Sequence, residues 1–329
     1  MTTQSGLYVR ELDAEAHGRD ADRPSAMPKR GWRDILLRVW KNIDRDNVLV
    51  IAAGMAFFAF LAIPPGLTAL VSLYGLLADP VDIEDQLTNL LGVLPPDAIR
   101  LVSHQLAAIA QNSSSTLSIG FVVSLAVALW SARSGTSTLI TALNIAYKER
   151  EKRGIIEFNF IVLALTLCAA LVAAVSLVLV AILPAVLDFI PFPGVATTVA
   201  RLARWPILAI LMMTAMAAVY RFAPSRSYAK WRWVSWGAVA GATLWLAASV
   251  LFSLYVEALA PYNRLYGSLG AVVVLMTWLY LTCIAILLGA ELDAEIEHQT
   301  ARDSTTDPEK PLGRRGAAMA DTVGEAARD

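Results

Sequence analysis

Charged side chains are scarce in this chain. Lys, Arg, Asp and Glu together make up 17% of its 329 residues, whereas 57% of the residues are hydrophobic. Soluble domains typically carry about 25% charged residues, which keep their surface in water. The composition therefore excludes a soluble globular protein, a disordered chain and a collagen-like chain, and it indicates a protein that lies largely in a lipid bilayer.

Patterns of metal-ligating and nucleophilic residues are missing as well. The only cysteines, Cys168 and Cys283, lie in apolar runs, and the three histidines, His17, His104 and His298, are scattered. None of these residues has the spacing of zinc ligands. The sequence also lacks the phosphate-binding loop of nucleotide hydrolases and the Gly-x-Ser-x-Gly turn of serine hydrolases. We therefore expect no metal, no cofactor and no enzymatic activity.

Positive charge shows no overall excess. The chain has 27 Lys and Arg against 28 Asp and Glu, which gives a formal net charge of −1. A nucleic-acid-binding protein needs a basic field that attracts phosphates. We therefore expect no nucleic-acid partner.

Long apolar runs make up much of the sequence. A bilayer core about 30 Å thick requires roughly 20 apolar residues in a helix that rises 1.5 Å per residue. The fourth run is the shortest and spans the core only if its flanking arginines reach the membrane surface. The sequence predicts an all-α membrane protein whose domain covers residues 29–299, with six spans at about 48–78, 117–142, 158–187, 200–220, 233–256 and 267–290.

The connections differ in their content of Lys and Arg. Residues 29–45 contain six basic residues, and residues 148–153 and 221–232 contain four each, whereas the alternate connections contain only Arg100, Arg201, Arg204 and Arg264. Positively charged loops remain in the cytoplasm. We therefore expect a protein of the cytoplasmic membrane with both termini inside the cell.

Two kinds of segment lie outside the predicted spans. Residues 31–43 have helical apolar periodicity with basic residues on other faces, which is typical of an amphipathic helix that lies on the inner leaflet. Residues 1–28 and 300–329 are polar, and we expect both tails to be disordered. The apolar positions of the amphipathic helix are Trp32, Ile35, Leu36, Val39, Trp40 and Ile43.

Arg133 is a basic residue inside the second predicted span. An arginine in the middle of a spanning helix costs about 2.5–3.5 kcal/mol unless it finds water or a partner. We expect Arg133 to face the bundle interior and to pair with Glu291; the alternative is that it reaches lipid phosphates and pairs with nothing. The hydroxyls that recur around it belong to Ser131, Ser134, Thr138 and Thr141.

Two adjacent prolines, Pro64 and Pro65, interrupt the first predicted span. Each proline removes a backbone donor and clashes with the preceding turn, so this helix must kink or break. A broken helix in a membrane often marks the substrate site of a transporter, whereas a bend has no functional meaning by itself.

Several motifs together resemble the YihY/BrkB family of bacterial inner-membrane proteins. The first is Tyr-Asn-Arg-Leu-Tyr-Gly-Ser-Leu-Gly at 262–270, followed by Trp-Leu-Tyr at 278–280 and Gly-Ala-Glu-Leu at 289–292; the second begins with Leu-Trp-Ser at 129–131 and continues to 147. The resemblance covers about residues 30–295. It implies a six-helix integral membrane protein in a family with members linked to virulence and serum resistance. The family once carried a ribonuclease label, but this chain lacks the clustered His and Asp ligands of a metal-dependent nuclease.

Two functions agree with these observations. The first is a transporter or flippase that moves an amphiphilic, lipid-like substrate through a polar groove. The second is a scaffold without catalytic activity that binds an envelope protein or a second copy of the chain. Membrane lipids are the expected partners in the first case. The candidate groove residues are Arg133, Ser131, Ser134, Thr138, Pro64, Pro65, Tyr262, Asn263, Tyr266 and Glu291.

Overall fold

The regular structure of the protein is helical. The computed structural model describes residues 15–77, 114–177, 179, 194–258, 268–306 and 308–326. Within these residues, the only β-type pairing is an isolated bridge between Ala229 and Thr305. The predicted all-α fold is therefore confirmed. The six long helices are α3 (Val48–Leu77), α6 (Ser114–Ala146), α7 (Ile155–Leu177), α9 (Gly194–Phe222), α10 (Trp231–Ala258) and α12 (Ser268–Gln299).

Five of these helices are long and apolar enough to cross a membrane. They are α3, α7, α9, α10 and α12, as judged over the described residues. The sixth, α6, has 33 residues, which exceeds the length that a span requires, but its first turns lie partly outside the residues whose side chains are described. The six-span count therefore stays a prediction, although a long helix occurs at each predicted position.

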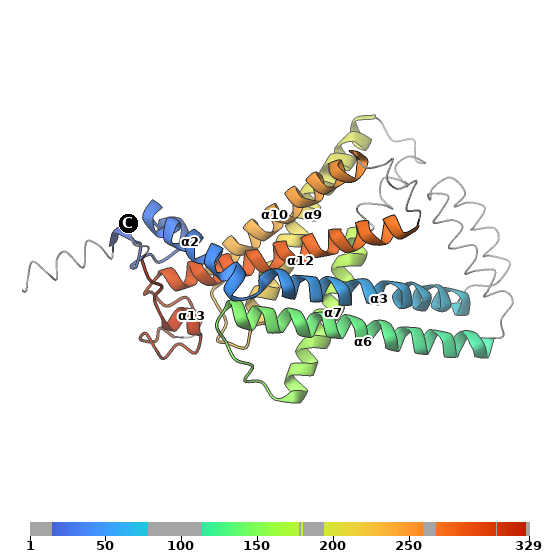
Figure 1. The fold of residues 1–329 in the computed structure, drawn as a ribbon, viewed down its shortest axis with the longest axis horizontal. Helices are drawn as coiled ribbons and strands as arrows, with labels where there is room; N and C mark the ends of the chain where they lie inside the picture. The colour runs from blue at the N-terminus through green and yellow to red at the C-terminus, as the bar shows by residue number, and fades with distance from the viewer. Residues whose placement is uncertain are drawn as a thin grey trace, which may run out of the picture.

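The long helices pack in pairs (Figure 1). α3 lies alongside α6 over much of its length, and α12 packs between α10 and α3. α9 packs against α10. α7 crosses α6 and also contacts α9, so it leaves much of its own surface and one flank of α6 uncovered.

Glycines set the close approach of α10 to α12. A Cβ atom on Gly237 would overlap the carbonyl oxygen of Gly289, and a Cβ atom on Gly289 would overlap the hydroxyl of Tyr220. That hydroxyl donates a hydrogen bond of 2.7 Å to the carbonyl oxygen of Ile286 on α12. Gly237 and Gly241, the glycine pair of α10, therefore bring two helices of the same chain together.

The proline pair does not break the first long helix. α3 runs through Pro64 and Pro65 as one helix of 30 residues. The predicted alternative of a broken span is therefore wrong. Two prolines remove two backbone donors, and the packing of α3 along α6 holds the segments on either side of them in one helix.

Two connections of the described chain and both described terminal segments gather at one end of the bundle. We call this region the cap; it comprises residues 15–45, 147–154, 223–230 and 300–326, at the left of Figure 1. It contains α2 (Lys29–Arg45) and two short helices, η1 (Pro24–Ala26) and α13 (Ala318–Asp321).

The two terminal segments of the cap are held to each other. The backbone N–H of Ala301 donates to the carbonyl oxygen of Arg19 at 2.7 Å. The hydroxyl of Thr300 donates to the carbonyl oxygen of Ala21 at 2.6 Å. The expectation of disordered tails is therefore wrong for residues 15–28 and for the described part of 300–329, and these two segments lie at the same end of the bundle.

A buried arginine organises the C-terminal segment. The side chain of Arg315 is 5% exposed and donates to the carbonyl oxygens of Ala320 and Ala301, each at 2.6 Å. It also donates to the carbonyls of Arg302 and Lys310. A polar sequence can fold here because a guanidinium, with five donors, satisfies backbone groups that an apolar core would leave unpaired.

We predict that Gly237→Ala destabilises the bundle. The added methyl group meets backbone and side-chain atoms of α12, and overpacking of this kind costs about 1–3 kcal/mol. Thermal unfolding in detergent should show a clear decrease in the midpoint. Gly54→Ala is the matched control: it introduces the same methyl group in a helix where nothing lies within 4 Å of the new atom, so its midpoint should not decrease. Equal midpoints for the two variants would contradict the proposed packing.

Arg315→Ala should release the C-terminal segment, because four backbone carbonyls lose their buried donor. Limited digestion with proteinase K should cut residues 300–326 much faster than in the unmodified protein. The control is Arg314→Ala, since the neighbouring Arg314 is exposed and its loss should leave the digestion rate unchanged. If the Arg315 variant resisted the protease equally well, the guanidinium would not hold this segment.

Candidate functional site

Arg133 lies on the uncovered flank of α6. Its side chain is exposed, beside Leu129 and Trp130, which are 40% and 58% exposed. Its Nη2 donates to Oδ1 of Asn159, on the first turns of α7, at 2.5 Å. The expectation that Arg133 faces the bundle interior is therefore wrong, because α7 crosses α6 instead of covering it.

The predicted pairing of Arg133 with Glu291 is also wrong. Glu291 is 1% exposed and lies beside Ala142 and Ala146, near the end of α6. At 1.5 Å per residue, positions 133 and 142 are separated by about 14 Å along the helix. The two side chains are therefore at different depths, and each has another partner: Asn159 for Arg133 and Asn42 for Glu291.

The hydroxyls of α6 do not form a polar surface around Arg133. Ser134 and Thr138 donate to carbonyl oxygens of their own helix, four residues earlier, each at 2.9 Å. Ser131 is fully buried and its hydroxyl has no partner among the described residues. These hydroxyls therefore satisfy their hydrogen bonds locally or face the interior, whereas Arg133 faces outward.

The other candidate groove residues do not join this site. Pro64 is exposed and Pro65 is half-buried on the unbroken α3. Tyr262, Asn263 and Tyr266 lie outside the described residues. Arg133 is an exposed charged candidate with a hydrogen-bond partner on another helix. That partner, Asn159, was missed because it is uncharged, although an amide one turn into an apolar run is a detectable signal.

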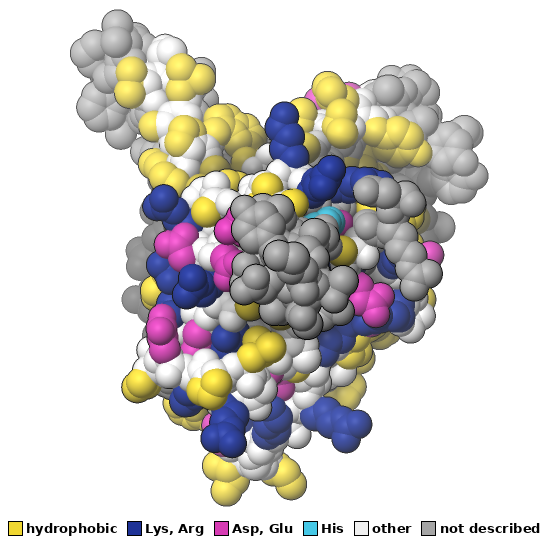
Figure 2. Space-filling model, turned by 90° about the vertical axis from the view of Figure 1, so that its left-hand side faces the viewer, with side chains coloured by type: hydrophobic (Ala, Val, Ile, Leu, Met, Phe, Trp, Pro, Cys, Tyr) yellow, Lys and Arg dark blue, Asp and Glu magenta, His cyan; other side chains and the backbone are white. Residues whose placement is uncertain are grey.

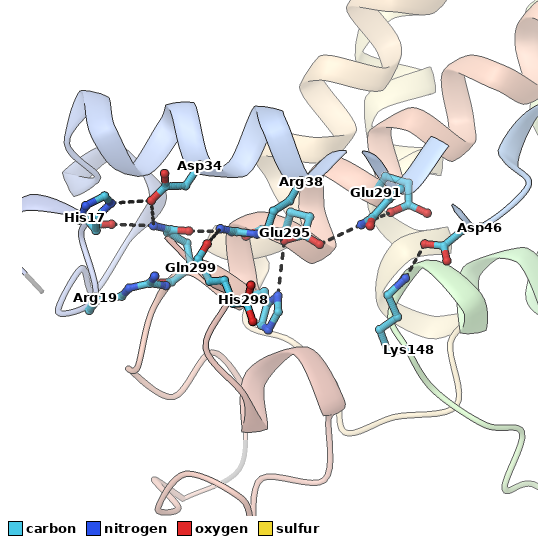
Figure 3. Close-up of polar contacts among 12 residues, drawn as sticks. His17, Arg19, Asp34, Arg38, Asp46, Lys148, Glu291, Glu295, His298 and Gln299 are labelled. Carbon is cyan, nitrogen blue, oxygen red and sulfur yellow. Dashed lines mark hydrogen bonds and ion pairs between the residues drawn. The ribbon is translucent and has the colours of Figure 1, made fainter. Parts of the chain in front are cut away.

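A second polar cluster lies inside the cap, between α2 and α12 (Figure 3). The two helices run antiparallel, and polar side chains spaced four residues apart on one helix meet polar side chains with the same spacing on the other. We call this cluster the ladder. Its members are Asp34, Arg38 and Asn42 on α2 and Glu291, Glu295 and Gln299 on α12.

Arg38 is the centre of the ladder. Its Nε donates to Glu295 at 2.5 Å, and its Nη2 donates to the side chain of Gln299 at 2.6 Å. Asn42 donates to Glu295 at 2.9 Å and to Glu291 at 3.3 Å. At the far end, His17 contacts Asp34 at 2.5 Å, which attaches the N-terminal segment to the same row of side chains.

The opposite face of α12 carries a second pair of buried acids. Glu297 forms an ion pair with Arg226, and the two side chains are only 2% and 1% exposed. The guanidinium of Arg226 lies 4.0 Å from the centre of the Tyr147 ring. Burial would lower the pKa of Arg226, but the nearby Glu297 and Tyr147 raise it, so this arginine stays charged.

Asp293 completes this face. It accepts a hydrogen bond of 3.0 Å from the backbone N–H of Gly237 and one of 3.2 Å from the hydroxyl of Tyr147. Burial, together with the charge of Asp293, raises the pKa of Tyr147 well above its usual range, so the phenol keeps its proton and acts as a donor. The acids of α12 are therefore held by neighbours on both faces of the helix.

A small depression lies where the ladder meets the bundle. Its cavity volume is about 10 Å³, and it is lined by Asp46, Glu291 and apolar residues of α3, α6 and α12. Asp46 forms an ion pair with Lys148. Asn47 lies two residues after the end of α2, and Lys148 lies two residues after the end of α6. Both have positive φ angles, of 53° and 55°. The depression is too small for an amphiphile, since ligand pockets measure about 300–1,000 Å³.

Ion pairs occur in the ladder, between Arg38 and Glu295, and on the opposite face of α12, between Arg226 and Glu297. Within the described ranges, no group of three or more His, Cys, Asp or Glu side chains is placed to hold a metal ion. The ladder and the Arg226 pair join distant parts of the chain and leave Arg133 as the exposed guanidinium on the flank of the bundle.

Comparison with known proteins gives one family. Residues 39–313 match the profile of the family described as virulence factor BrkB. The chain is 32% identical over 255 residues to the ribonuclease-like protein YfkH of Bacillus subtilis, covering 74% of this chain and 88% of that protein. It is 27% identical over 268 residues to a UPF0761 membrane protein of Psychromonas ingrahamii, covering 80% and 87%. No solved structure matches the chain.

We predict that Arg226→Met strongly destabilises the protein, because it leaves Glu297 as an unpaired buried charge. Such a loss costs about 3–5 kcal/mol, measurable as the free energy of unfolding in mixed detergent and dodecyl sulfate micelles. The double variant Arg226→Met with Glu297→Met should recover much of the loss. Arg45→Met is the matched control, because Arg45 is 64% exposed beside Asp46 and surface pairs contribute at most about 1 kcal/mol. Equal effects of the two single variants would contradict the burial of the Arg226 pair.

Proposed function

The chain belongs to the BrkB family and is an integral membrane protein, and from this premise we propose that it binds and moves an anionic amphiphile along the exposed flank of α6. Arg133 is the proposed contact for the head group. The observation that carries this proposal is the exposed guanidinium of Arg133 on the long helix α6, held at 2.5 Å by the amide of Asn159.

The energetic cost of Arg133 supports a functional role. An arginine at this depth costs about 2.5–3.5 kcal/mol, and such residues usually face water, a partner or a ligand. The guanidinium has five donors in a fixed planar array, and among the described residues its hydrogen bond is to Asn159. A phosphate matches the remaining donors, because two parallel N–H groups of arginine bind two phosphate oxygens. The apolar side chains of Leu129 and Trp130 beside it suit acyl chains.

We place the protein in the bacterial cytoplasmic membrane with the cap and both termini in the cytoplasm. The three basic segments of the sequence, residues 29–45, 148–153 and 221–232, all lie in or next to the cap. Figure 2 shows Lys and Arg side chains spread over this end of the molecule, with Asp and Glu among them. Such an excess of basic connections is typical of the cytoplasmic side.

The proposed activity is not enzymatic. The ribonuclease-like name belongs to the relative YfkH, and hydrolysis of RNA by metal ions would need a cluster of ligands in water. The acids of α12 are instead engaged by Arg38, Asn42, Arg226 and Tyr147. We propose lipid, not nucleic acid, as the partner of this chain.

A scaffold function is the second candidate. The scaffold function is favoured by the ordered cap. Some of its charged residues form internal ion pairs, and hydrogen bonds join its two terminal segments. A preformed surface of this kind can bind an envelope protein, or a second copy of the chain, without ordering a segment first. In this function Arg133 only contacts lipid and its replacement changes nothing.

The test is lipid movement in vesicles that contain the purified protein. We expect fluorescent phosphatidylglycerol in the inner leaflet to become accessible to external dithionite, faster than in vesicles without protein. Arg133→Gln should slow this movement roughly tenfold, since a hydrogen bond to a charged group contributes about 1.5–3 kcal/mol. The measurement is the rate of loss of fluorescence.

Arg232→Gln is the matched control, because it removes an exposed arginine at the start of α10, next to the cap, and should leave the rate unchanged. A rate that is the same with and without protein, for anionic and zwitterionic lipids alike, would rule out flipping and leave the scaffold function. Movement that is equal in the unmodified protein and the Arg133 variant would remove Arg133 from the proposed pathway.

A further inference from the structure

We propose that the outward face of α2 is a binding surface for anionic phospholipid head groups in the leaflet next to the cap. This surface is distinct from the flank of α6, and the proposal does not depend on lipid movement at Arg133. It rests on which side chains α2 buries, which it exposes, and where the helix is attached.

α2 exposes three large apolar side chains on the side that faces away from the ladder. Asp34 and Asn42 are 2% and 3% exposed, because they belong to the ladder with α12. Ile35 is also fully buried and packs in a core cluster with Trp233 and Ile296. On the other side, Leu36, Leu37 and Trp40 are 57%, 41% and 74% exposed. These side chains form a second apolar group outside the core, and exposed Leu and Trp on one side of a helix suit the head-group region of a membrane.

Basic residues border and interrupt this apolar strip of Leu36, Leu37 and Trp40. Lys29 and Arg30 lie about two turns before the two leucines, Arg33 lies one turn before them, and Lys41 follows Trp40. All four basic side chains are exposed. Asp44 is the exposed acid at the end of the same helix. A combination of Lys and Arg with Trp and Leu on one side of a helix is typical of segments that lie in the head-group region of anionic membranes.

The attachment of α2 holds this surface at the level of the membrane boundary. α2 ends at Arg45 and α3 begins at Val48, so only Asp46 and Asn47 separate it from a candidate membrane span. The first turn of α3 exposes Leu49 and Val50, which are 45% and 71% exposed. The chain therefore has no slack that would let the C-terminal end of α2 move away from the bilayer surface.

The ladder fixes which side of α2 faces outward. The contacts of Arg38 with Glu295 and Gln299 prevent the helix from rotating about its own axis. Trp32 also packs against Trp236 of α10, with ring centroids 5.6 Å apart. Leu36, Leu37 and Trp40 are thus presented in a preorganised arrangement, which lowers the entropy lost on binding. A surface of anionic lipid is the occupant that matches an apolar strip bordered and interrupted by basic residues next to a candidate membrane span.

The test places a probe on the strip of the full-length protein. Leu36→Cys, in a chain that also carries Cys168→Ser and Cys283→Ala, is labelled with an environment-sensitive fluorophore and reconstituted into phosphatidylcholine vesicles with increasing fractions of phosphatidylglycerol. We expect quenching by nitroxide-labelled lipid to rise with the phosphatidylglycerol fraction. Raising the salt concentration should reverse this quenching, because salt screens charges near a surface.

The variant Lys29→Gln, Arg30→Gln, Lys41→Gln tests the basic border. Each lost charge weakens binding to an anionic surface by roughly fivefold, so half-maximal quenching should need at least a fivefold higher fraction of phosphatidylglycerol. The matched control is Arg150→Gln, Arg232→Gln, Arg314→Gln, which removes the same charge from exposed positions elsewhere in or next to the cap and should quench like the parent chain. Thermal unfolding of both triple variants checks that each is folded.

Two outcomes would overturn the proposal. Quenching that does not depend on lipid charge or salt would show that α2 does not recognise anionic lipid. If deletion of residues 1–14 caused quenching in pure phosphatidylcholine where the full chain has none, the occupant of the strip would be the N-terminal segment of the same chain. The lipid-movement assay is unaffected by either outcome, so failure here is distinguishable from failure of the proposed function.

Discussion

The burial of four carboxylates on the last turns of α12 is the constraint on which the cap depends. Glu291, Asp293, Glu295 and Glu297 alternate along the helix, so they point to two opposite faces, and each face must supply partners. A buried ionised carboxylate without partners is very costly. The polar side of α2 serves one face, and Arg226 with Tyr147 serves the other. The two connections that contain Arg226 and Tyr147 pack against α12 because their hydrogen-bond donors are required by its carboxylates.

This constraint explains why the arginines of the cap are paired inside the protein whereas Arg133 on α6 is exposed. In the cap, arginine side chains are consumed by internal pairs: Arg38 by Glu295, Arg226 by Glu297 and Arg315 by backbone carbonyls. On the flank of α6, Arg133 has the neutral partner Asn159 and stays exposed. Internal pairs make a rigid unit, whereas an exposed guanidinium is available to a ligand. The two proposed lipid contacts, at Arg133 and on the outer side of α2, both lie where side chains remain outside this internal pairing.

The sequence predicted the positions of the long helices well and the placement of individual side chains poorly. Apolar runs locate membrane helices because the cost of burying polar groups in lipid applies to every residue of the run. The orientation of Arg133 could not be read in this way, since it depends on α7 crossing α6. The pairing with Glu291 failed for a related reason: depth along a helix can be counted, but the faces that meet depend on packing. The four-residue spacing of polar side chains on α2 and on α12 is visible in the sequence. Only the fold shows that these two rows of side chains contact each other.

The sequence by itself determined that this is a helical membrane protein of the BrkB family, with two basic connections and a basic segment before the first long helix. These properties follow from composition and from short motifs, which act locally and independently of distant residues. Only the tertiary structure decided that the described parts of the polar tails are ordered, that Arg133 faces outward and that α2 buries Ile35 while Leu36, Leu37 and Trp40 stay exposed. Each of these depends on contacts between residues far apart in the chain, such as Arg38 with Glu295 and Ala301 with Arg19. A hydrogen-bond donor finds its acceptor by position in space, and spacing along the chain does not record that position.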